Sequence, residues 1–198
     1  MNQISTFASP VLGVSKDTAD FLLKVIGVLG FAALTGLAAQ IAVPLPGTPV
    51  PMTLQTLAVT LAAFTLGARL GTVSMVVYIA AAAAGLPMLS KGGSGVTEIL
   101  GATGGYLIGF VVSQPVMALS ARNGKGFGGA KGLISSLVLG SVVILGCGVL
   151  WQMMWLKWDF STALSRGVWP FLPGDVVKSA AAFVLGFGLV PWACKRGW

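Results

Sequence analysis

Histidine is absent from the sequence, and charged side chains make up only 9% of its 198 residues. There are five acidic residues and two cysteines, Cys147 and Cys194, which lack metal-ligand spacing. The chain therefore offers no Ser-His-Asp arrangement, no carboxylate pair and no ligand set for zinc or haem. No phosphate-binding glycine motif stands between a strand and a helix. We expect a protein that is not an enzyme and that holds no metal ion and no cofactor.

The chain is instead rich in apolar residues, which form 56% of the sequence and recur in long runs along its whole length. A soluble domain carries roughly 25% charged residues, so this composition indicates a membrane protein with several spans. The first 20 residues lack a basic start followed by an apolar core, and we expect no cleavable signal peptide. The predicted organisation is a tail at residues 1–20 and one membrane domain at residues 21–198.

The apolar runs predict six transmembrane helices in a compact all-α bundle. Their expected ranges are 21–43, 52–66, 72–89, 106–121, 133–156 and 175–193. The second is short, because an ordinary span needs roughly 17 to 25 residues. Two glycines that flank Arg69 predict a tight turn between the second and the third.

The net charge of +7 bears on orientation rather than on nucleic acid, because the cations form no patch with interleaved aromatic residues. With six spans, both termini lie on one side of the membrane. That side holds eight of the twelve lysines and arginines, against three on the other, with Lys178 inside the last span. The positive-inside rule predicts that both termini lie in the cytoplasm, so residues 1–20 would form a cytoplasmic tail. The lipid bilayer that the helices cross would be the inner membrane of a bacterium.

One acid and one base interrupt the last apolar run, in the stretch Leu172-Pro173-Gly174-Asp175-Val176-Val177-Lys178. Asp175 and Lys178 lie three residues apart, so on a helix they share one face, and Pro173-Gly174 suits a helix that begins nearby. Ionisable residues inside a membrane segment are expensive and are usually functional. The alternative is a salt bridge that fixes the helix end at the interface, or a lysine that extends to water.

Two unusual loops are predicted on the same, extracytoplasmic side. Residues 44–51 include four prolines, which exclude a helix and stiffen the loop into an extended structure. Residues 90–105 are rich in glycine, which lets a backbone approach a ligand closely. Gln55 and Tyr106 follow these loops. Together these features predict an outward-facing site for a small solute.

The pairing of a carboxylate with an ammonium group suits a particular ligand edge. A carboxylate accepts two parallel N–H bonds and an ammonium group donates to a carbonyl, so the pair matches the two N–H groups and the C=O of a cyclic urea. Amino acids and vitamins with similar edges would satisfy the same pair. The chemistry narrows the ligand without naming it.

Several motifs together resemble the BioY family, the biotin-specific S components of energy-coupling-factor (ECF) transporters. The resemblance covers the six-span core and rests on the stretches 44–46, 49–59, 66–71, 84–87, 104–110 and 172–178. It implies a six-helix membrane protein that binds biotin from outside. Such proteins usually work with a transmembrane coupling protein and two ATP-binding subunits, although members reported to work without a dedicated module are also known.

The resemblance also implies which residues bind the ligand. The acid and the lysine of the last-helix motif correspond to Asp175 and Lys178, and the family's pocket is bordered at positions that correspond to Gln55 and Tyr106. For the carboxylate of biotin we expect Lys91 together with the backbone amides of residues 92–95.

Small residues on the first helix resemble the family's docking surface for the coupling protein, at Ala32 and Gly36. Close packing of this helix within the chain itself is the alternative. Two other functions also remain open at this stage: an S component for a different vitamin, and a structural membrane subunit that has no ligand.

Overall fold

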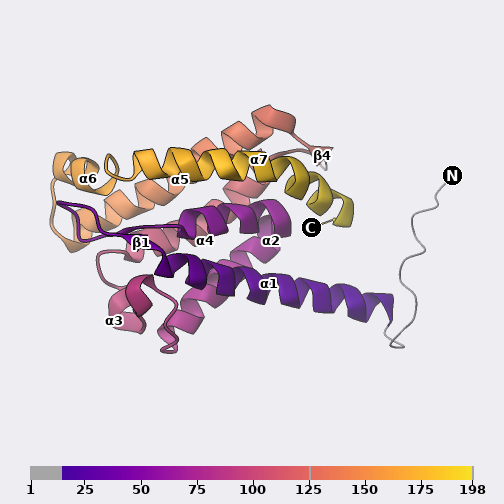
Figure 1. The fold of residues 1–198 in the computed structure, drawn as a ribbon, viewed down its shortest axis with the longest axis horizontal. Coiled ribbons are helices and arrows are strands. Elements are labelled where there is room, and N and C mark those ends of the chain that lie inside the picture. Colours follow the sequence, from indigo (N-terminus) through magenta and orange to yellow (C-terminus); the bar gives the residue numbers. More distant parts are fainter. Residues whose placement is uncertain (1–14, 125, 198) are drawn as a thin grey trace.

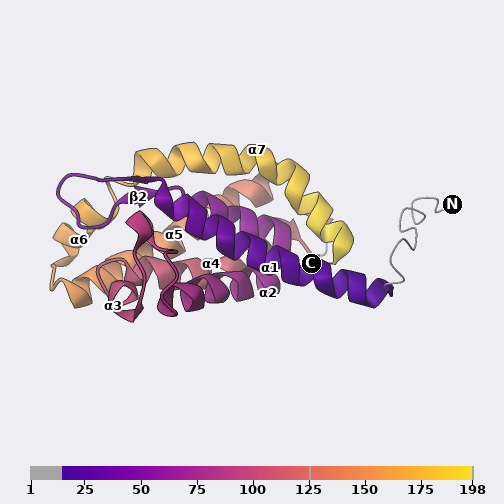
Figure 2. The same ribbon diagram turned by 60° about the horizontal axis from the view of Figure 1, so that its bottom comes forward.

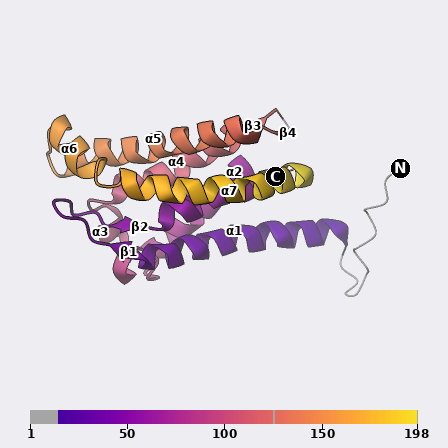
Figure 3. The ribbon, with the colours of Figure 1, turned by 45° about the horizontal axis from the view of Figure 1, so that its top comes forward.

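Long helices dominate the computed structural model, which describes residues 15–124 and 126–197 (Figure 1). The five longest helices are α1 (Lys16–Gln40), α2 (Gln55–Ala83), α4 (Gly104–Ser120), α5 (Gly129–Trp155) and α7 (Leu172–Arg196). α1 and α5 lie on opposite outer sides of the molecule (Figures 1 and 3). The predicted all-α class is confirmed.

Four of these helices, α1, α2, α5 and α7, are long and apolar enough to cross a membrane. The fifth, α4, is apolar but has only 17 residues. This arrangement agrees with a protein that passes through a membrane several times. The number of crossings depends on how α2 is treated, because that helix is not straight.

α2 is divided at Gly67, whose φ of 73° and ψ of −172° lie outside the helical region. A positive φ of this size is strained for residues other than glycine. The chain folds back at this point, since the backbone oxygen of Ala62 lies 3.6 Å from where a Cβ atom on Gly71 would stand. The break lies at the turn predicted between the second and third spans, and it divides α2 into two arms, residues 55–66 and 68–83.

The proline-rich loop is held at both ends by a small antiparallel sheet. Strand β1 (Ala42–Val43) pairs with β2 (Met52–Thr53), with Ala42 opposite Thr53. The loop therefore forms a hairpin with a turn and bends between the strands, and it contains no helix, as its prolines predicted. A second small sheet, β3 (Arg122–Asn123) with β4 (Gly126–Phe127), follows α4.

Three short helices complete the chain, and the sequence prediction contained none of them. They are the 3₁₀ helix η1 (Ser90–Gly92), α3 (Val96–Ile99) and α6 (Phe160–Gly167). The strand β2, α3 and α6 gather at one end of the molecule, whereas the first turn of α1 and the last turn of α7 lie toward the other (Figure 2). We refer to these as the loop end and the terminal end.

The first helix begins earlier than residue 21, where the sequence predicted it. Ser15 caps α1 by accepting a hydrogen bond from the backbone N–H of Thr18, and Asp17 lies in the first turn. Both features stabilise a helix start, because they satisfy or complement its free N–H groups. Residues 16–20 thus belong to α1, and the rest of the predicted tail, apart from Ser15, lies outside the described residues.

The small residues of α1 face the interior of the protein. Ala32 is only 3% exposed, and Gly36 is buried against the side chain of Met88, whose sulfur lies 2.8 Å from where a Cβ atom on Gly36 would stand. Close packing within the chain, the alternative considered for this motif, is therefore the arrangement that the structure has. Neither residue is on the surface.

An apolar cluster fills the core toward the terminal end. Its buried members come from α2, α5, α7 and the end of α4: Phe64, Ala121, Leu133, Ala182 and Val190. Gly186 of α7 lets α5 approach closely, because a Cβ atom there would lie 2.6 Å from Leu133 Cδ2. We call these residues the closed cluster.

Candidate ligand-binding cavity

A cavity opens at the loop end, where three helices begin. The first residues of α2, α4 and α7, which are Gln55, Gly104 and Leu172, lie at this end, and α5 forms a further wall. The empty volume is about 540 Å³, with the open space at its mouth included. The lining residues are Val50, Pro51, Thr53, Gln55, Thr56, Ser90, Thr103, Tyr106, Leu107, Phe110, Ile144, Leu145, Phe171, Asp175 and Lys178.

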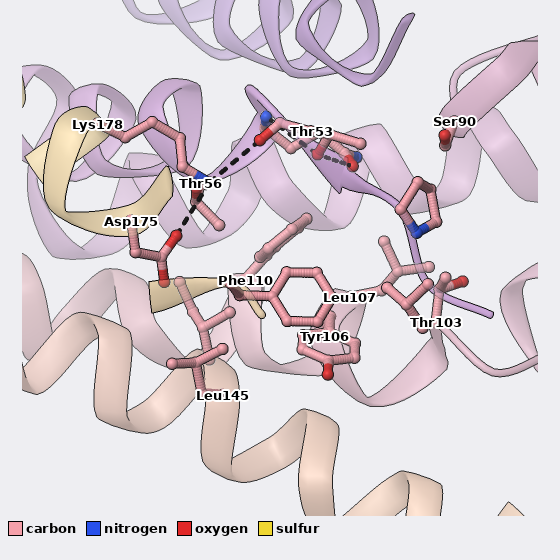
Figure 4. Close-up of a pocket in the computed structure, with 15 residues that line it drawn as sticks. Thr53, Thr56, Ser90, Thr103, Tyr106, Leu107, Phe110, Leu145, Asp175 and Lys178 are labelled. Atoms are coloured by element: carbon pink, nitrogen blue, oxygen red, sulfur yellow. Dashed lines mark hydrogen bonds and ion pairs between the residues drawn. The ribbon is translucent and has the colours of Figure 1, made fainter. Parts of the chain in front are cut away.

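Asp175 and Lys178 form an ion pair in the wall of this cavity. The Lys178 Nζ atom lies 2.9 Å from Asp175 Oδ1, and the side chains are only 10% and 12% exposed (Figure 4). Both residues stand in the first turns of α7, at the helical spacing of three that the sequence predicted. An acid in the first turn also complements the dipole of the helix.

The ion pair is tied to the proline-rich hairpin. Lys178 Nζ donates a hydrogen bond of 3.2 Å to the backbone oxygen of Thr53, a residue of β2. An ammonium group has three N–H donors, so the bonds to Asp175 and Thr53 leave one for a ligand. The lysine thus has a fixed position and a spare donor.

Gln55, two residues after Thr53, belongs to a buried hydrogen-bonded network. Its side-chain oxygen accepts a bond of 2.8 Å from the Thr53 hydroxyl, and its Nε2 donates to the Tyr78 hydroxyl at 2.5 Å. Tyr78 in turn donates to the backbone oxygen of Met88 at 3.2 Å. The amide of Gln55 is therefore held from both sides, and its orientation depends on the loop after α2.

Tyr106 lines the cavity with its ring, while its hydroxyl points elsewhere. The hydroxyl donates a 2.8 Å bond to the backbone oxygen of Gly167, at the end of α6, and the ring lies 5.9 Å from that of Phe171. Tyr106 therefore supplies an apolar surface rather than a polar contact. The sequence predicts that Tyr106 borders the site, but it does not predict where the hydroxyl points, because that direction depends on α6.

The helix that receives this bond is stabilised at its start by Asp159. The Asp159 carboxylate accepts bonds from the hydroxyl and the backbone N–H of Thr162. These hydrogen bonds lower the pKa of Asp159 below its ordinary value, and the bond from the hydroxyl has the larger effect. The cap remains ionised and intact at neutral pH, and it keeps α6 in place next to Tyr106.

Apolar side chains cover the remaining wall. They come from α4, α5 and the start of α7: Leu107, Phe110, Ile144, Leu145 and Phe171. Small-molecule sites typically combine such a surface with a few fixed polar groups. The sequence analysis did not select these residues, although Leu107 and Phe110 share a helical face with Tyr106 by their spacing.

Two hydroxyl groups in the lining have no hydrogen-bond partner among the described residues. They are Thr56 Oγ1 and Ser90 Oγ, and both are buried. Figure 4 shows Thr56 next to Asp175 and Lys178, and Ser90 on the opposite side of the cavity. Buried polar atoms are normally bonded, so these two are available to a ligand. The sequence analysis did not single out either residue.

Lys91 is separated from the ion pair and lines an adjoining hollow. That hollow shares Pro51, Gln55, Ser90, Thr103 and Leu107 with the main cavity. Lys91 itself is exposed, and Glu98 lines the same hollow. The structure thus brings four of the five predicted residues to one cavity and places the fifth beside it.

The amides expected to assist Lys91 are largely occupied. The N–H of Gly92 donates to Gln40 Oε1, that of Gly93 to the oxygen of Ser90, and that of Gly95 to the oxygen of Ala82. These three groups hold the loop together. They leave the side chain of Lys91 as the predicted contact for a carboxylate.

Comparison with known proteins decides the family. The model of the BioY family matches residues 10–193, which is most of the chain. The chain belongs to the BioY family. This confirms the resemblance that the sequence motifs indicated.

Relatives in the BioY family are similar over most of their length. A probable biotin transporter BioY from Pyrococcus horikoshii is 38% identical over 155 residues, which cover 78% of this chain and 88% of the relative. A biotin transporter BioY from Thermotoga maritima is 34% identical over 166 residues, which cover 84% and 95%. The family is therefore one of transporters rather than of enzymes, and its members are multi-pass membrane proteins.

A solved structure has the same fold. It is the crystal structure at 2.1 Å of the S-component for biotin from an ECF-type ABC transporter, with a TM-score of 0.78. The match covers 87% of this chain and 92% of that one at 24% sequence identity. At this identity the likeness establishes the S-component fold for the present BioY chain.

Proposed function

We propose that this chain captures biotin and takes part in its uptake as the S component of an ECF transporter. The observation that carries the proposal is the cavity in which a fixed Asp175–Lys178 pair faces an apolar wall. Membership in a family of biotin transporters supports the same conclusion.

The polar side of the cavity suits the cyclic urea of biotin. Asp175 can accept the two urea N–H groups, and the spare N–H of Lys178 can donate to the urea oxygen. Because Thr53 and Asp175 already fix the ammonium group, little side-chain freedom is lost when the ligand binds. The hydroxyl of Thr56 is available beside the same edge.

The long axis of the cavity suits the remainder of the ligand. The apolar wall can cover the thioether ring and the aliphatic chain, which would run toward Ser90 and Thr103 on the opposite side (Figure 4). Lys91 would then meet the ligand carboxylate in the adjoining hollow. Glu98 lies in that hollow too, so its replacement by glutamine should strengthen binding of the anionic end.

In the membrane, we propose six crossings with both termini in the cytoplasm. The two arms of α2, residues 55–66 and 68–83, would be the second and third crossings, joined at Gly67. The first arm spans only about 18 Å at 1.5 Å per residue, which is consistent with a helix that begins at the cavity instead of at the membrane surface. The cavity would open on the outer side of a bacterial cytoplasmic membrane.

The proposed partners are a transmembrane coupling protein and two ATP-binding subunits. Contact at Ala32 and Gly36 would require α1 to separate from Met88, because both residues are buried against the protein's own interior. The outer face of α1, which includes Leu29 and Leu37, is exposed along the same turns. A coupling protein that meets this face needs no such separation.

The decisive experiment is isothermal titration of biotin into the detergent-purified protein after removal of any ligand carried over. We expect saturable binding with one biotin per chain, and its loss in Lys178→Ala. The matched control is Lys131→Ala, at the start of α5, which should bind as the wild type does.

Two other results would replace the proposal. Binding of thiamine or riboflavin in place of biotin would make the chain an S component for a different vitamin. No heat and no thermal stabilisation with any vitamin, from protein shown to be folded and empty, would favour a structural membrane subunit.

A further inference from the structure

Gln40, in the last turn of α1, binds the loop that follows α2. Its Nε2 group donates to the backbone oxygens of Leu89 at 3.0 Å and Pro87 at 3.2 Å, and it also lies 3.0 Å from the oxygen of Gly36. Its Oε1 accepts a bond of 2.9 Å from the N–H of Gly92. One side chain thus bonds the segment at three points, and we call residues 87–92 the 87–92 loop.

The 87–92 loop forms part of the cavity wall. Ser90, whose hydroxyl has no partner among the described residues, lines the main cavity, and Lys91 lines the adjoining hollow. The carbonyl of Met88 accepts the bond from Tyr78, which holds Gln55. The position of this loop therefore sets three of the groups that line the cavity and the adjoining hollow: Ser90, Lys91 and Gln55.

Gln40 shares the task of restraining this loop with the bond from Tyr78 to the Met88 carbonyl and with the burial of Leu89. Near its ends, Leu86 N–H bonds to the oxygen of Ala81, and Gly95 N–H to that of Ala82, so both ends are attached to α2. Between these points, the loop is connected to α1 by the hydrogen bonds to Gln40 and by the packing of Met88 against Gly36. Without the bonds to Gln40, the carbonyls of Pro87 and Leu89 and the N–H of Gly92 would lose this partner, and the part of the loop that carries Ser90 and Lys91 would open more often.

We infer that Gln40 is a positioning residue that holds the 87–92 loop over the cavity and slows the release of bound biotin. The inference rests on the proposed function, because biotin is the ligand whose release is measured. The amide acts through the loop and does not itself line the cavity. Its oxygen and its nitrogen contribute separately, so the donor can be removed alone by Gln40→Glu or together with the acceptor by Gln40→Leu.

The test compares two variants with the wild type in detergent. Gln40→Leu loses every bond to the loop, whereas Gln40→Glu keeps an acceptor for the Gly92 N–H and loses the donor to the two carbonyls. Leu37→Ala, on the exposed face one turn earlier, is the matched control. The measurements are the biotin association and dissociation rates and hydrogen exchange of a peptide that contains Gly92.

Gln40→Leu should release biotin about tenfold faster with an unchanged association rate, because only part of the free energy of the three lost bonds acts on the bound state. Gln40→Glu should release biotin faster as well. Exchange at Gly92 should accelerate in Gln40→Leu and remain slow in Gln40→Glu. A role in global stability alone would lower the folded fraction of both variants and would leave the release rate of the folded protein unchanged.

The inference is overturned if Gln40→Leu releases biotin at the wild-type rate, or if exchange at Gly92 is the same in the wild type and both variants. An equal change in Leu37→Ala would also overturn it. These results differ from failure of the proposed function, in which the wild type itself would bind no biotin.

Discussion

The two halves of α7 use the same helical face for opposite purposes. Asp175, Lys178, Ala182, Gly186 and Val190 follow one another at intervals of three or four residues, so they form one stripe along the helix. At the loop end the stripe carries an ion pair and borders an open cavity. At the terminal end it carries small apolar residues and packs without space into the closed cluster.

The difference between the halves shows what decides whether a buried face binds a ligand. In the closed cluster, Gly186 lets Leu133 and Phe64 approach α7, and the apolar surfaces satisfy one another. Around the ion pair, α2 and α4 begin instead of continuing alongside α7, so side chains of their first turns line a cavity. Substitutions at the loop end should therefore change binding, and substitutions in the closed cluster should change stability.

The largest effect should come from Asp175→Asn. Loss of the charge removes the acceptor for two charge-assisted bonds, so we expect biotin affinity to fall by about 100-fold or more. The melting temperature of the ligand-free protein should fall by only about 2–4 °C. Calorimetric titration and a thermal-shift assay measure the two quantities. Val177→Ala, at an exposed position of the same helix, should leave both unchanged. A normal affinity in Asp175→Asn would show that the ion pair does not bind the ligand.

In the closed cluster, the corresponding change is Leu133→Ala. Leu133 is fully buried, and the cavity left by its side chain should reduce the free energy of unfolding by about 3 kcal/mol. The protein that remains folded should bind biotin with the wild-type affinity. Denaturant titration in detergent, followed by biotin titration, tests both statements. The neighbouring Ile134→Ala, on the exposed side of α5, is the control; a loss of affinity in Leu133→Ala would contradict the separation of the two halves.

A smaller effect should follow from Tyr78→Phe. The substitution removes the hydroxyl that links Gln55 to the backbone oxygen of Met88, and it should cost about 1–2 kcal/mol of stability. Gln55 would lose its orientation, so we also expect affinity to fall about fivefold. Thermal unfolding and biotin titration measure these changes. Tyr106→Phe loses one bond to Gly167 without touching this network and serves as the comparison; equal affinities for both variants would mean that Gln55 needs no support.

The smallest effect is expected at Asp159, on the exposed start of α6. Because its pKa is lowered in the folded protein, the carboxylate stabilises the fold above its ordinary pKa, and this contribution is lost as the pH falls through the folded-state value. Asp159→Ala should lower the melting temperature slightly at pH 7, by less than any change above. The difference from the wild type should disappear under acidic conditions, and a difference that stays constant with pH would show that the charge is not responsible.

The sequence predicted the helices and the ion pair because both depend on local patterns. Apolar runs marked every long helix, and the turn at Gly67 was predicted from the two glycines, Gly67 and Gly71, that flank Arg69. The spacing of Asp175 and Lys178 predicts that they share one face of a helix, and in the structure they form an ion pair there. These features depend on residues close together in the chain, so their periodicity can be read directly.

Contacts between distant segments could not be predicted in the same way. The hydroxyl of Tyr106 points to α6, a helix of only eight residues that contains no long apolar run, and Thr53 holds Lys178 through a backbone oxygen that no side-chain motif reveals. A glycine at position 36 is compatible with close packing against Met88 and equally with close packing against a partner, so its identity does not distinguish the two roles. Spacing identifies the stripe on a helix, but the rotation of that helix depends on its neighbours.

The beginning of three helices at one cavity has a consequence for how this scaffold can diversify. The first turns of α2 and α7 lie outside the closed cluster, so exchanges at Gln55 and Leu172 alter what is recognised without reaching that cluster, whereas Gly104 must stay small because a Cβ atom there would lie 2.6 Å from the oxygen of Ile99. The closed cluster meanwhile preserves the architecture. New substrate preferences are thus accessible through a handful of substitutions, and a laboratory library confined to the first turns of α2 and α7 would sample them while the closed cluster stays unchanged.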